Sequence, residues 1–181
     1  MIRLFAAIEL PDRVRAYLSG MAGGVPGARW TPPENMHLTL AFIGNVEDSL
    51  FADIDAALAQ VRAPGFDLAV EGVGAFRRGR VPAMLWAGVA RNDALDHLHG
   101  RVSAALTRAG VTLERRKFTP HVTLARLKGS PRARVEAFLA DHSLMRAEPF
   151  AVEGFTLFSS FLGHAGAIYR AESTYPLQPR P

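Results

Sequence analysis

The chain has 181 residues, of which 49% are hydrophobic and 21% are charged, an ordinary globular composition that excludes a disordered or fibrous protein. It has no cysteine, which excludes disulfides and thiolate metal ligands and favours a reducing compartment. The formal net charge of +4 suits an anionic partner without identifying one. No apolar run approaches the roughly 18 residues that a membrane span needs. We therefore expect one cytoplasmic domain.

Hydrophobic periodicity and turn residues predict a chain in which strands and helices alternate. The predicted elements, in chain order, are a strand at 2–9, a helix beginning at 11, a strand at 37–43, a helix at 48–61, strands at 66–76 and 81–90, a helix at 92–110, a strand at 120–127, a helix beginning at 131, and strands at 148–158 and 166–175. The apolar start is short and lacks a cleavage site, which favours a buried strand over a signal peptide. Asp48 is expected to cap the helix that begins there.

One four-residue word occurs twice, as His37-Leu38-Thr39-Leu40 and as His121-Val122-Thr123-Leu124. Successive side chains of a strand point to opposite faces. Each word therefore sends a His and a Thr to one side, and two aliphatic residues to the other. The aliphatic side can join a core, which leaves the polar side free for chemistry.

A second repeat indicates that the chain is a duplication. The two His words are 84 residues apart (121 minus 37). Ala69-Val70-Glu71-Gly72 recurs as Ala151-Val152-Glu153-Gly154, at an offset of 82 residues (151 minus 69). The period is too long for a solenoid. We predict an α+β fold, a single domain over residues 1–181 in which two pseudo-symmetric lobes of antiparallel sheet and helices each give one His strand to a central cleft.

Two histidines and two threonines around one space suit acid–base chemistry on a phosphate. One imidazole can take a proton while the other gives one, and the Thr hydroxyls can donate to phosphate oxygens. A lone His-x-Thr pair is most often a surface feature, but the repeated placement favours a site. Two histidines without a third ligand make an incomplete zinc site. The sequence also lacks a Gly-x-Ser-x-Gly elbow and a phosphate-binding Gly-rich loop with Lys-Ser/Thr.

These words and their surroundings resemble the 2H phosphoesterase superfamily, and within it the RNA 2′,3′-cyclic phosphodiesterases first described as 2′-5′ RNA ligases. The similarity covers essentially the whole chain. The segments that carry it are Arg3-Leu4-Phe5-Ala6-Ala7-Ile8-Glu9-Leu10-Pro11, Trp30-Thr31-Pro32-Pro33-Glu34-Asn35-Met36 and Phe118-Thr119-Pro120-His121-Val122-Thr123-Leu124-Ala125-Arg126.

The resemblance implies a hydrolase that opens 2′,3′-cyclic phosphates at RNA 3′ ends and leaves a 2′-phosphate, without metal or other cofactor. His37 would be the general acid that protonates the departing 3′ oxygen, and His121 the general base that activates water. Thr39 and Thr123 would hold the non-bridging phosphate oxygens. Some members also join RNA ends through a 2′-5′ bond. The expected partner is RNA with a cyclic phosphate terminus, tRNA fragments being one candidate, and the chain is expected to be a monomer.

Further substrate contacts are expected from Arg126, Trp30, Phe5 and Phe76. Arg126 lies at an odd offset from the histidine of its word, so it reaches the site only if the strand ends or bulges near there. The three aromatic residues are candidates for base stacking, although most aromatic residues of such a domain belong to the core, which favours packing for each of them taken alone. Ala6 stands where some relatives carry an aromatic residue. Two alternatives remain open: a 2H phosphoesterase for another cyclic or 2′-5′-linked nucleotide, and a non-catalytic module that binds RNA ends.

Overall fold

The computed structural model describes residues 1–180. They form ten strands, four α-helices and one 3-10 turn at Pro33–Asn35. The strands and helices are, in chain order, β1 (Ile2–Glu9), α1 (Asp12–Ser19), β2 (Ala28–Trp30), β3 (His37–Val46), α2 (Asp48–Ala59), β4 (Phe66–Leu68), β5 (Val70–Arg78), β6 (Val81–Val89), α3 (Asp93–Arg108), β7 (His121–Leu127), α4 (Arg132–Asp141), β8 (Phe150–Val152), β9 (Gly154–Gly163) and β10 (Gly166–Pro176). This composition confirms the predicted α+β class.

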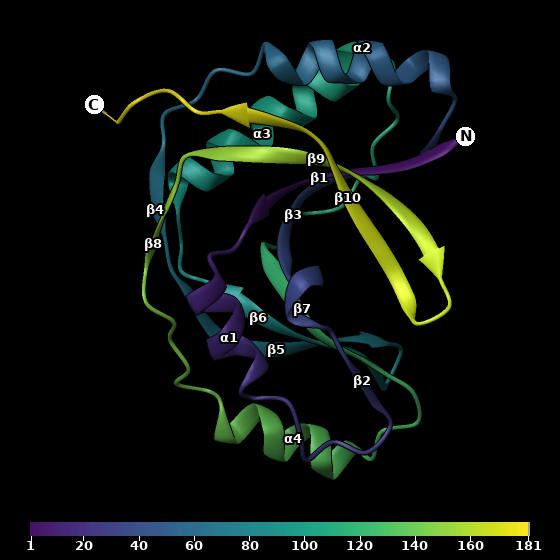
Figure 1. Ribbon diagram of the computed structural model, residues 1–181. Helices are drawn as coiled ribbons and strands as arrows, with labels where there is room; N and C mark the ends of the chain where they lie inside the picture. Colours follow the sequence, from purple (N-terminus) through teal and green to yellow (C-terminus); the bar gives the residue numbers. More distant parts are fainter. Residues whose placement is uncertain (181) are drawn as a thin grey trace.

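Eight of the strands form one antiparallel sheet. Its order is β10-β9-β1-β3-β7-β6-β5, with β2 paired to β7, and β4 and β8 form a separate two-stranded sheet. Figure 1 shows α2 and α3 together beside β1, β9 and β10, while α1 and α4 lie at the other end of the molecule with β5 and β6. The junction between these two parts is the contact of β3 with β7, where the two His words begin.

The helices are held by apolar stripes that face the sheet. In α3, Leu95, Leu98 and Val102 recur at helical spacing and are fully buried. The side chain of Asn92 caps this helix, because its oxygen accepts from the backbone N–H of Leu95 at 3.0 Å. In α2, Ile54 and Leu58 are buried in the same way. Burial of these stripes fixes the outer layer and, through it, the strands beneath.

The predicted order of strands and helices is confirmed, with three differences. Asp48 does not cap α2: it is the first helical residue, and its carboxylate lies 3.6 Å from the N-terminal amine. A short strand, β2, precedes the first His word; the sequence did not predict it, because the glycines before it indicated a loop. The predicted strands 66–76 and 148–158 are each two strands, because β4 and β8 pair with each other while β5 and β9 join the main sheet.

Two backbone pairs match the spacing of the repeated words. Leu38 pairs with Val122 between β3 and β7, and Asp67 pairs with Ala151 between β4 and β8. In each pair the second residue follows the first by 84 residues, the offset of the His words. Leu38 and Val122 are equivalent residues of the two words, and an antiparallel pair between equivalent residues is what a two-fold axis through that pair generates. Asp67 lies two residues before Ala69, the counterpart of Ala151 in the second repeat.

No helix within residues 1–180 combines the length and the apolar character that a membrane crossing requires.

Candidate active site

The two His-x-Thr words lie on neighbouring antiparallel strands and face the same side of the sheet. β3 and β7 meet at the backbone pair of Leu38 with Val122, and both of these side chains are fully buried. Alternation along each strand turns the flanking His and Thr side chains to the opposite face, where all four are half-buried. Continuing the antiparallel register by one residue in each direction sets each histidine beside the threonine of the other word.

A β-bulge on β7 returns Arg126 to the face that carries the histidine. On the neighbouring strand β6, Trp86 pairs with Thr123 and Met84 pairs with Arg126. Trp86 and Met84 are two residues apart and so share a face. Thr123 and Arg126 are three apart because Leu124 is the extra residue of the bulge. Arg126 was expected to reach the site only if the strand ended or bulged nearby, and the bulge meets this condition. The side chain of Arg126 is exposed.

The first word carries an equivalent bulge. The successive β1 residues Ala6 and Ala7 pair with Ala41 and Thr39, which leaves the leucine between the latter two unpaired. Phe42 therefore returns to the histidine face, where it is 65% exposed. Sequence reasoning missed Phe42. The sequence did contain a signal: in both words the threonine is followed by Leu-Ala, two apolar residues in a row. Two successive residues buried on the same side break the alternation of a strand, which indicates a bulge.

Each histidine is oriented by a hydrogen bond to the backbone two residues before it. Nδ1 of His37 lies 2.8 Å from the carbonyl oxygen of Asn35, and Nδ1 of His121 lies 2.7 Å from that of Thr119. A carbonyl oxygen only accepts, so Nδ1 must be the donor in both rings. Nε2 of each ring is therefore the nitrogen that is left to take or give a proton.

Asn35 also ties the turn before His37 to a distant strand. Its side-chain amide donates to the carbonyl oxygen of Ala167, in β10, at 2.9 Å. The same residue thus fixes the His37 ring through its backbone and the start of β10 through its side chain. Sequence reasoning did not single out Asn35, because the contact spans 132 residues.

Burial lowers the pKa of both histidines. The pKa of His37 falls from 6.5 to about 4, chiefly by burial; the bond to Asn35 opposes this fall, and the charges of His121 and Arg15 add to it. Burial also lowers the pKa of His121, against the hydrogen bond to Thr119. Both imidazoles are therefore neutral at neutral pH in the free protein. The two histidines directly precede the paired residues Leu38 and Val122, so they lie on neighbouring strands of one sheet face.

We expect a bound phosphate anion to raise the pKa of His37 from its low value. In the free protein an NMR titration should show His37 changing charge near pH 4. Inorganic phosphate beside the ring favours imidazolium by charge attraction, so the same titration with phosphate should move upward in pH. A variant with both threonines changed to valine binds the anion less well, and should show a smaller movement. A free-protein value near 6.5, or no response to phosphate, would contradict this electrostatic picture.

Aromatic side chains surround both histidine rings. Phe5 stacks on His37 with ring centroids 4.8 Å apart, and Tyr169 meets the same ring edge-on at 5.3 Å. Phe76 meets His121 edge-on at 4.8 Å, and Trp86 lies 6.3 Å from that ring. These apolar walls supply the burial that lowers both pKa values.

The structure separates the three aromatic residues that were expected to stack on a base. Phe76 lies at the site and is half-buried. Phe5 is only 4% exposed because one face of its ring stacks on His37 and the rest is covered by other side chains, so no face is free for a base. Trp30 pairs with Ala125, which points to the core, and packs 5.5 Å from Phe138 of α4 on the other side of the sheet. The packing of Trp30 and Phe5 argues against base stacking by either ring, and stacking by Phe76 stays a prediction.

We expect Gly74→Ala to disturb the His121 side of the site. Gly74 pairs with Trp86 across β5 and β6, and a Cβ at Gly74 would lie 2.2 Å from the indole ring. The ring would have to move, at a cost of about 1–3 kcal/mol in stability by overpacking, and activity should fall as well. The matched control is Gly100→Ala in α3, where a Cβ meets no atom within 4 Å. That change should raise stability by about 0.5–1 kcal/mol. Chemical denaturation should show a lower free energy of unfolding for Gly74→Ala and a higher one for Gly100→Ala than for the wild type.

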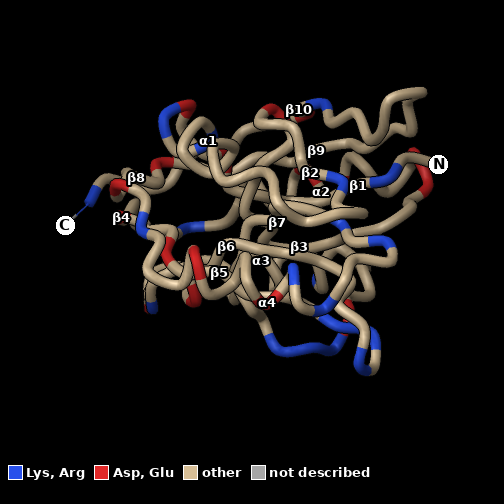
Figure 2. Tube along the Cα trace, turned by 90° about the horizontal axis from the view of Figure 1, so that it is seen from below, with Lys and Arg blue, Asp and Glu red and all other residues tan. Residues whose placement is uncertain are grey.

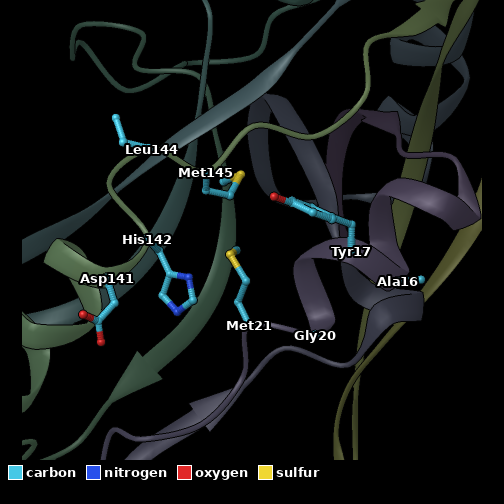
Figure 3. A pocket seen from close by; sticks show the side chains of 8 residues that line it. All are labelled: Ala16, Tyr17, Gly20, Met21, Asp141, His142, Leu144 and Met145. Atoms are coloured by element: carbon cyan, nitrogen blue, oxygen red, sulfur yellow. The ribbon is translucent and has the colours of Figure 1, made fainter.

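A hollow on another surface contains none of the residues described above. It measures about 610 Å³ and lies between α1 and the segment that follows α4. Figure 3 shows Tyr17 and Met21 on one side and His142 and Met145 on the other. Within residues 1–180, no group of three or more His, Asp or Glu side chains is placed to hold a metal ion.

Comparison with known proteins gives one consistent family. The model described as LigT like phosphoesterase matches residues 8–86 and 88–169. A Thermotoga maritima protein named RNA 2′,3′-cyclic phosphodiesterase is 34% identical over 175 residues, covering 93% of this chain and 92% of that protein. An Archaeoglobus fulgidus protein of the same name is 31% identical over 172 residues, covering 93% and 97%. Escherichia coli LigT complexed with 3′-AMP superposes with a TM-score of 0.79 at 26% identity, over 97% and 98% of the two chains.

Proposed function

Because the chain belongs to the LigT like phosphoesterase family, within the 2H phosphoesterase superfamily, we propose that it hydrolyses 2′,3′-cyclic phosphates at RNA 3′ ends. The observation that carries the proposal is the meeting of two His-x-Thr words on one face of β3 and β7, with Nε2 of both histidines free for proton transfer. The names of the relatives from Thermotoga maritima and Archaeoglobus fulgidus support this substrate class.

The proposed reaction divides proton transfer between the two histidines. Neutral His121 takes a proton from water at Nε2 as the water oxygen attacks phosphorus. The bond from phosphorus to the 3′ oxygen breaks, and Nε2–H of protonated His37 gives its proton to that oxygen. The product carries a 2′-phosphate and a 3′-hydroxyl. The phosphate itself promotes the protonated form of His37, because a nearby anion raises the low pKa of that ring.

The hydroxyls of Thr39 and Thr123 and the guanidinium of Arg126 are proposed to bind the reacting phosphate. Thr39 and Thr123 flank the histidines on the same face, and donors aimed at the non-bridging oxygens stabilise the negative charge that builds during attack. The bulge brings the exposed guanidinium of Arg126 to this face, where it can pair with a phosphate. Phe76, beside His121, is the remaining candidate for contact with a base.

A single incubation tests the proposal. The protein is mixed, in EDTA, with a short RNA that ends in a 2′,3′-cyclic phosphate, and the new end is identified. We expect a 2′-phosphate. A 3′-phosphate would keep the two-histidine chemistry but reverse the leaving group. An untouched end would instead favour the alternative in which the site only binds RNA ends.

Several sequence-based expectations stay proposals. They concern the origin of the two words by duplication, the monomeric state, the cytoplasmic location, 2′-5′ ligation as a second reaction, and tRNA fragments as the natural RNA. The pair Leu38–Val122 supports the duplication, because it joins the equivalent residues of the two words.

A further inference from the structure

A basic groove lies along β2 and β7, and Arg126 links it to the histidine face. Its basic residues are Arg29, Arg126 and Lys128, and its volume is about 590 Å³. We infer that this groove binds the phosphodiester backbone of the RNA strand that leads to the reacting 3′ end. The inference rests on the proposed function and adds to it the surface on which the RNA strand on the 5′ side of the reacting end lies.

The pairing of β2 with β7 places the basic side chains together. Arg29 is the direct backbone partner of Arg126, and direct partners in an antiparallel pair project from the same face. That face is the one that carries Thr123 and His121. Lys128 follows, and its backbone N–H donates to the carbonyl oxygen of Gly27 at 3.0 Å. A Cβ at position 27 would lie 2.4 Å from the carbonyl oxygen of Lys128, so glycine permits this close approach.

The charges of the groove are not neutralised within the protein. None of its three basic residues is among the ion pairs formed by residues 1–180. Like charges directly opposite each other on one sheet face are destabilising, so the Arg29–Arg126 pair costs stability when nothing lies between them. A backbone phosphate held by Arg29 offsets that repulsion while Arg126 contacts the reacting phosphate, and guanidinium is well suited to phosphate.

The spacing along β7 matches a strand of RNA rather than the reacting phosphate alone. Because Leu124 is the extra residue of the bulge, Arg126 lies two strand steps from Thr123, about 7 Å, and Lys128 four steps, about 13 Å, at about 3.3 Å per residue. A cyclic phosphate held by the two threonines leaves Lys128 beyond its reach. Since the cyclic phosphate ends the RNA on its 3′ side, all further phosphates lie on the 5′ side, and the groove is the adjacent surface of matching charge.

The rest of the molecule is consistent with attraction of a long polyanion. The net charge is +4, and Figure 2 shows Lys and Arg positions concentrated in the loops at the lower edge of the view, below α4. Such a field raises the rate at which a polyanion is captured, whereas the groove determines where its backbone lies.

Two substrates and two double variants test the inference. The variant Arg29→Ala/Lys128→Ala removes the groove charges but keeps Arg126. The control Arg62→Ala/Arg101→Ala removes the same net charge at the end of α2 and on the exposed side of α3. Each protein is assayed with 2′,3′-cyclic AMP and with an oligoribonucleotide that ends in a 2′,3′-cyclic phosphate.

We expect the groove variant to lose about 10-fold in kcat/KM on the oligonucleotide and to match the wild type on 2′,3′-cyclic AMP. The plot of log kcat/KM against log salt concentration should have a slope that is shallower by about 0.7 for each removed charge, since each phosphate contact with a single strand contributes about that much to the slope. The control should behave as the wild type on both substrates.

The outcomes separate this inference from the proposed function. Equal loss on both substrates, or no loss on the oligonucleotide, would overturn the groove assignment while leaving the hydrolytic proposal intact. If the wild type hydrolyses neither substrate, the proposed function fails and the groove inference falls with it. Equal effects of the groove variant and the control would show that only net charge matters, which also overturns the assignment.

Discussion

His37→Ala and His121→Ala are each expected to lower kcat on a 2′,3′-cyclic phosphate by about 10²- to 10⁴-fold, the usual contribution of a positioned acid or base. Each ring has one nitrogen committed to a backbone carbonyl, which leaves Nε2 as the atom for proton transfer. Removing either imidazole takes away one half of the proton transfer while leaving the threonine hydroxyls in place. Single-turnover kinetics with saturating enzyme measures the chemical step directly.

The binding of RNA ends distinguishes this result from loss of a binding site. Both variants should bind an RNA with a cyclic phosphate within a few-fold of the wild type, since the hydroxyls and Arg126 remain. The control His97→Ala changes an exposed residue of α3 and should keep full activity. Activity that survives in either site variant would contradict the two-histidine account. Loss of binding in step with turnover would favour the alternative of a phosphate-binding module.

The double change Thr39→Val/Thr123→Val is expected to lower kcat by at least the roughly 10²- to 10³-fold reported for loss of one donor to a developing oxyanion. Valine keeps the shape and the strand preference of threonine but removes the hydroxyl. The hydroxyls flank the histidines on the sheet face, where negative charge builds on the phosphate during attack. The comparison of kcat with KM is the measurement, and most of the loss should lie in kcat.

One control variant tests for simple loss of packing. Thr174→Val removes a hydroxyl from β10, where it lies 3.4 Å from the hydroxyl of Thr156, and leaves the site intact. It should keep kcat within a few-fold of the wild type. A loss confined to KM in Thr39→Val/Thr123→Val would show that the hydroxyls hold the ground state as strongly as the transition state, contrary to the proposed role.

The sequence predicted the elements and the paired words because their signals are local. Alternation in His37-Leu38-Thr39-Leu40 seats Leu38 in the core with no exposed area, and helical stripes such as Leu95, Leu98 and Val102 face the sheet as expected. The Asn92 cap agrees with the predicted helix start. These features depend on residues within a few positions of one another, so a single sequence reveals them.

The features that sequence reasoning missed depend on contacts between distant segments. β2 is three residues long and forms only because β7 offers it an edge. Trp30 carries an aromatic ring close in sequence to His37, yet pairing with Ala125 turns it toward α4. Asn35 acts through a carbonyl oxygen in β10. None of these partners can be assigned without the register of the sheet.

The bulges are an intermediate case. The sequence identified a bulge as the condition for Arg126 to reach the site, but alternation alone could not show that one occurs. Both words continue with Leu-Ala, and in both the structure buries these two residues in succession. The same local irregularity thus turns Phe42 and Arg126 to the histidine face, one aromatic and one basic. This difference between the words gives the two sides of the site different chemistry.

A substrate with sulfur in place of the 3′ bridging oxygen tests most directly whether the two histidines divide acid and base roles on one phosphate. A thiolate departs without a proton, because a thiol has a pKa of only about 8.5. We expect His37→Ala to recover near-wild-type turnover on this substrate while His121→Ala remains slow. Recovery in His121→Ala instead, or in neither variant, would contradict the assignment of His37 as the acid and His121 as the base.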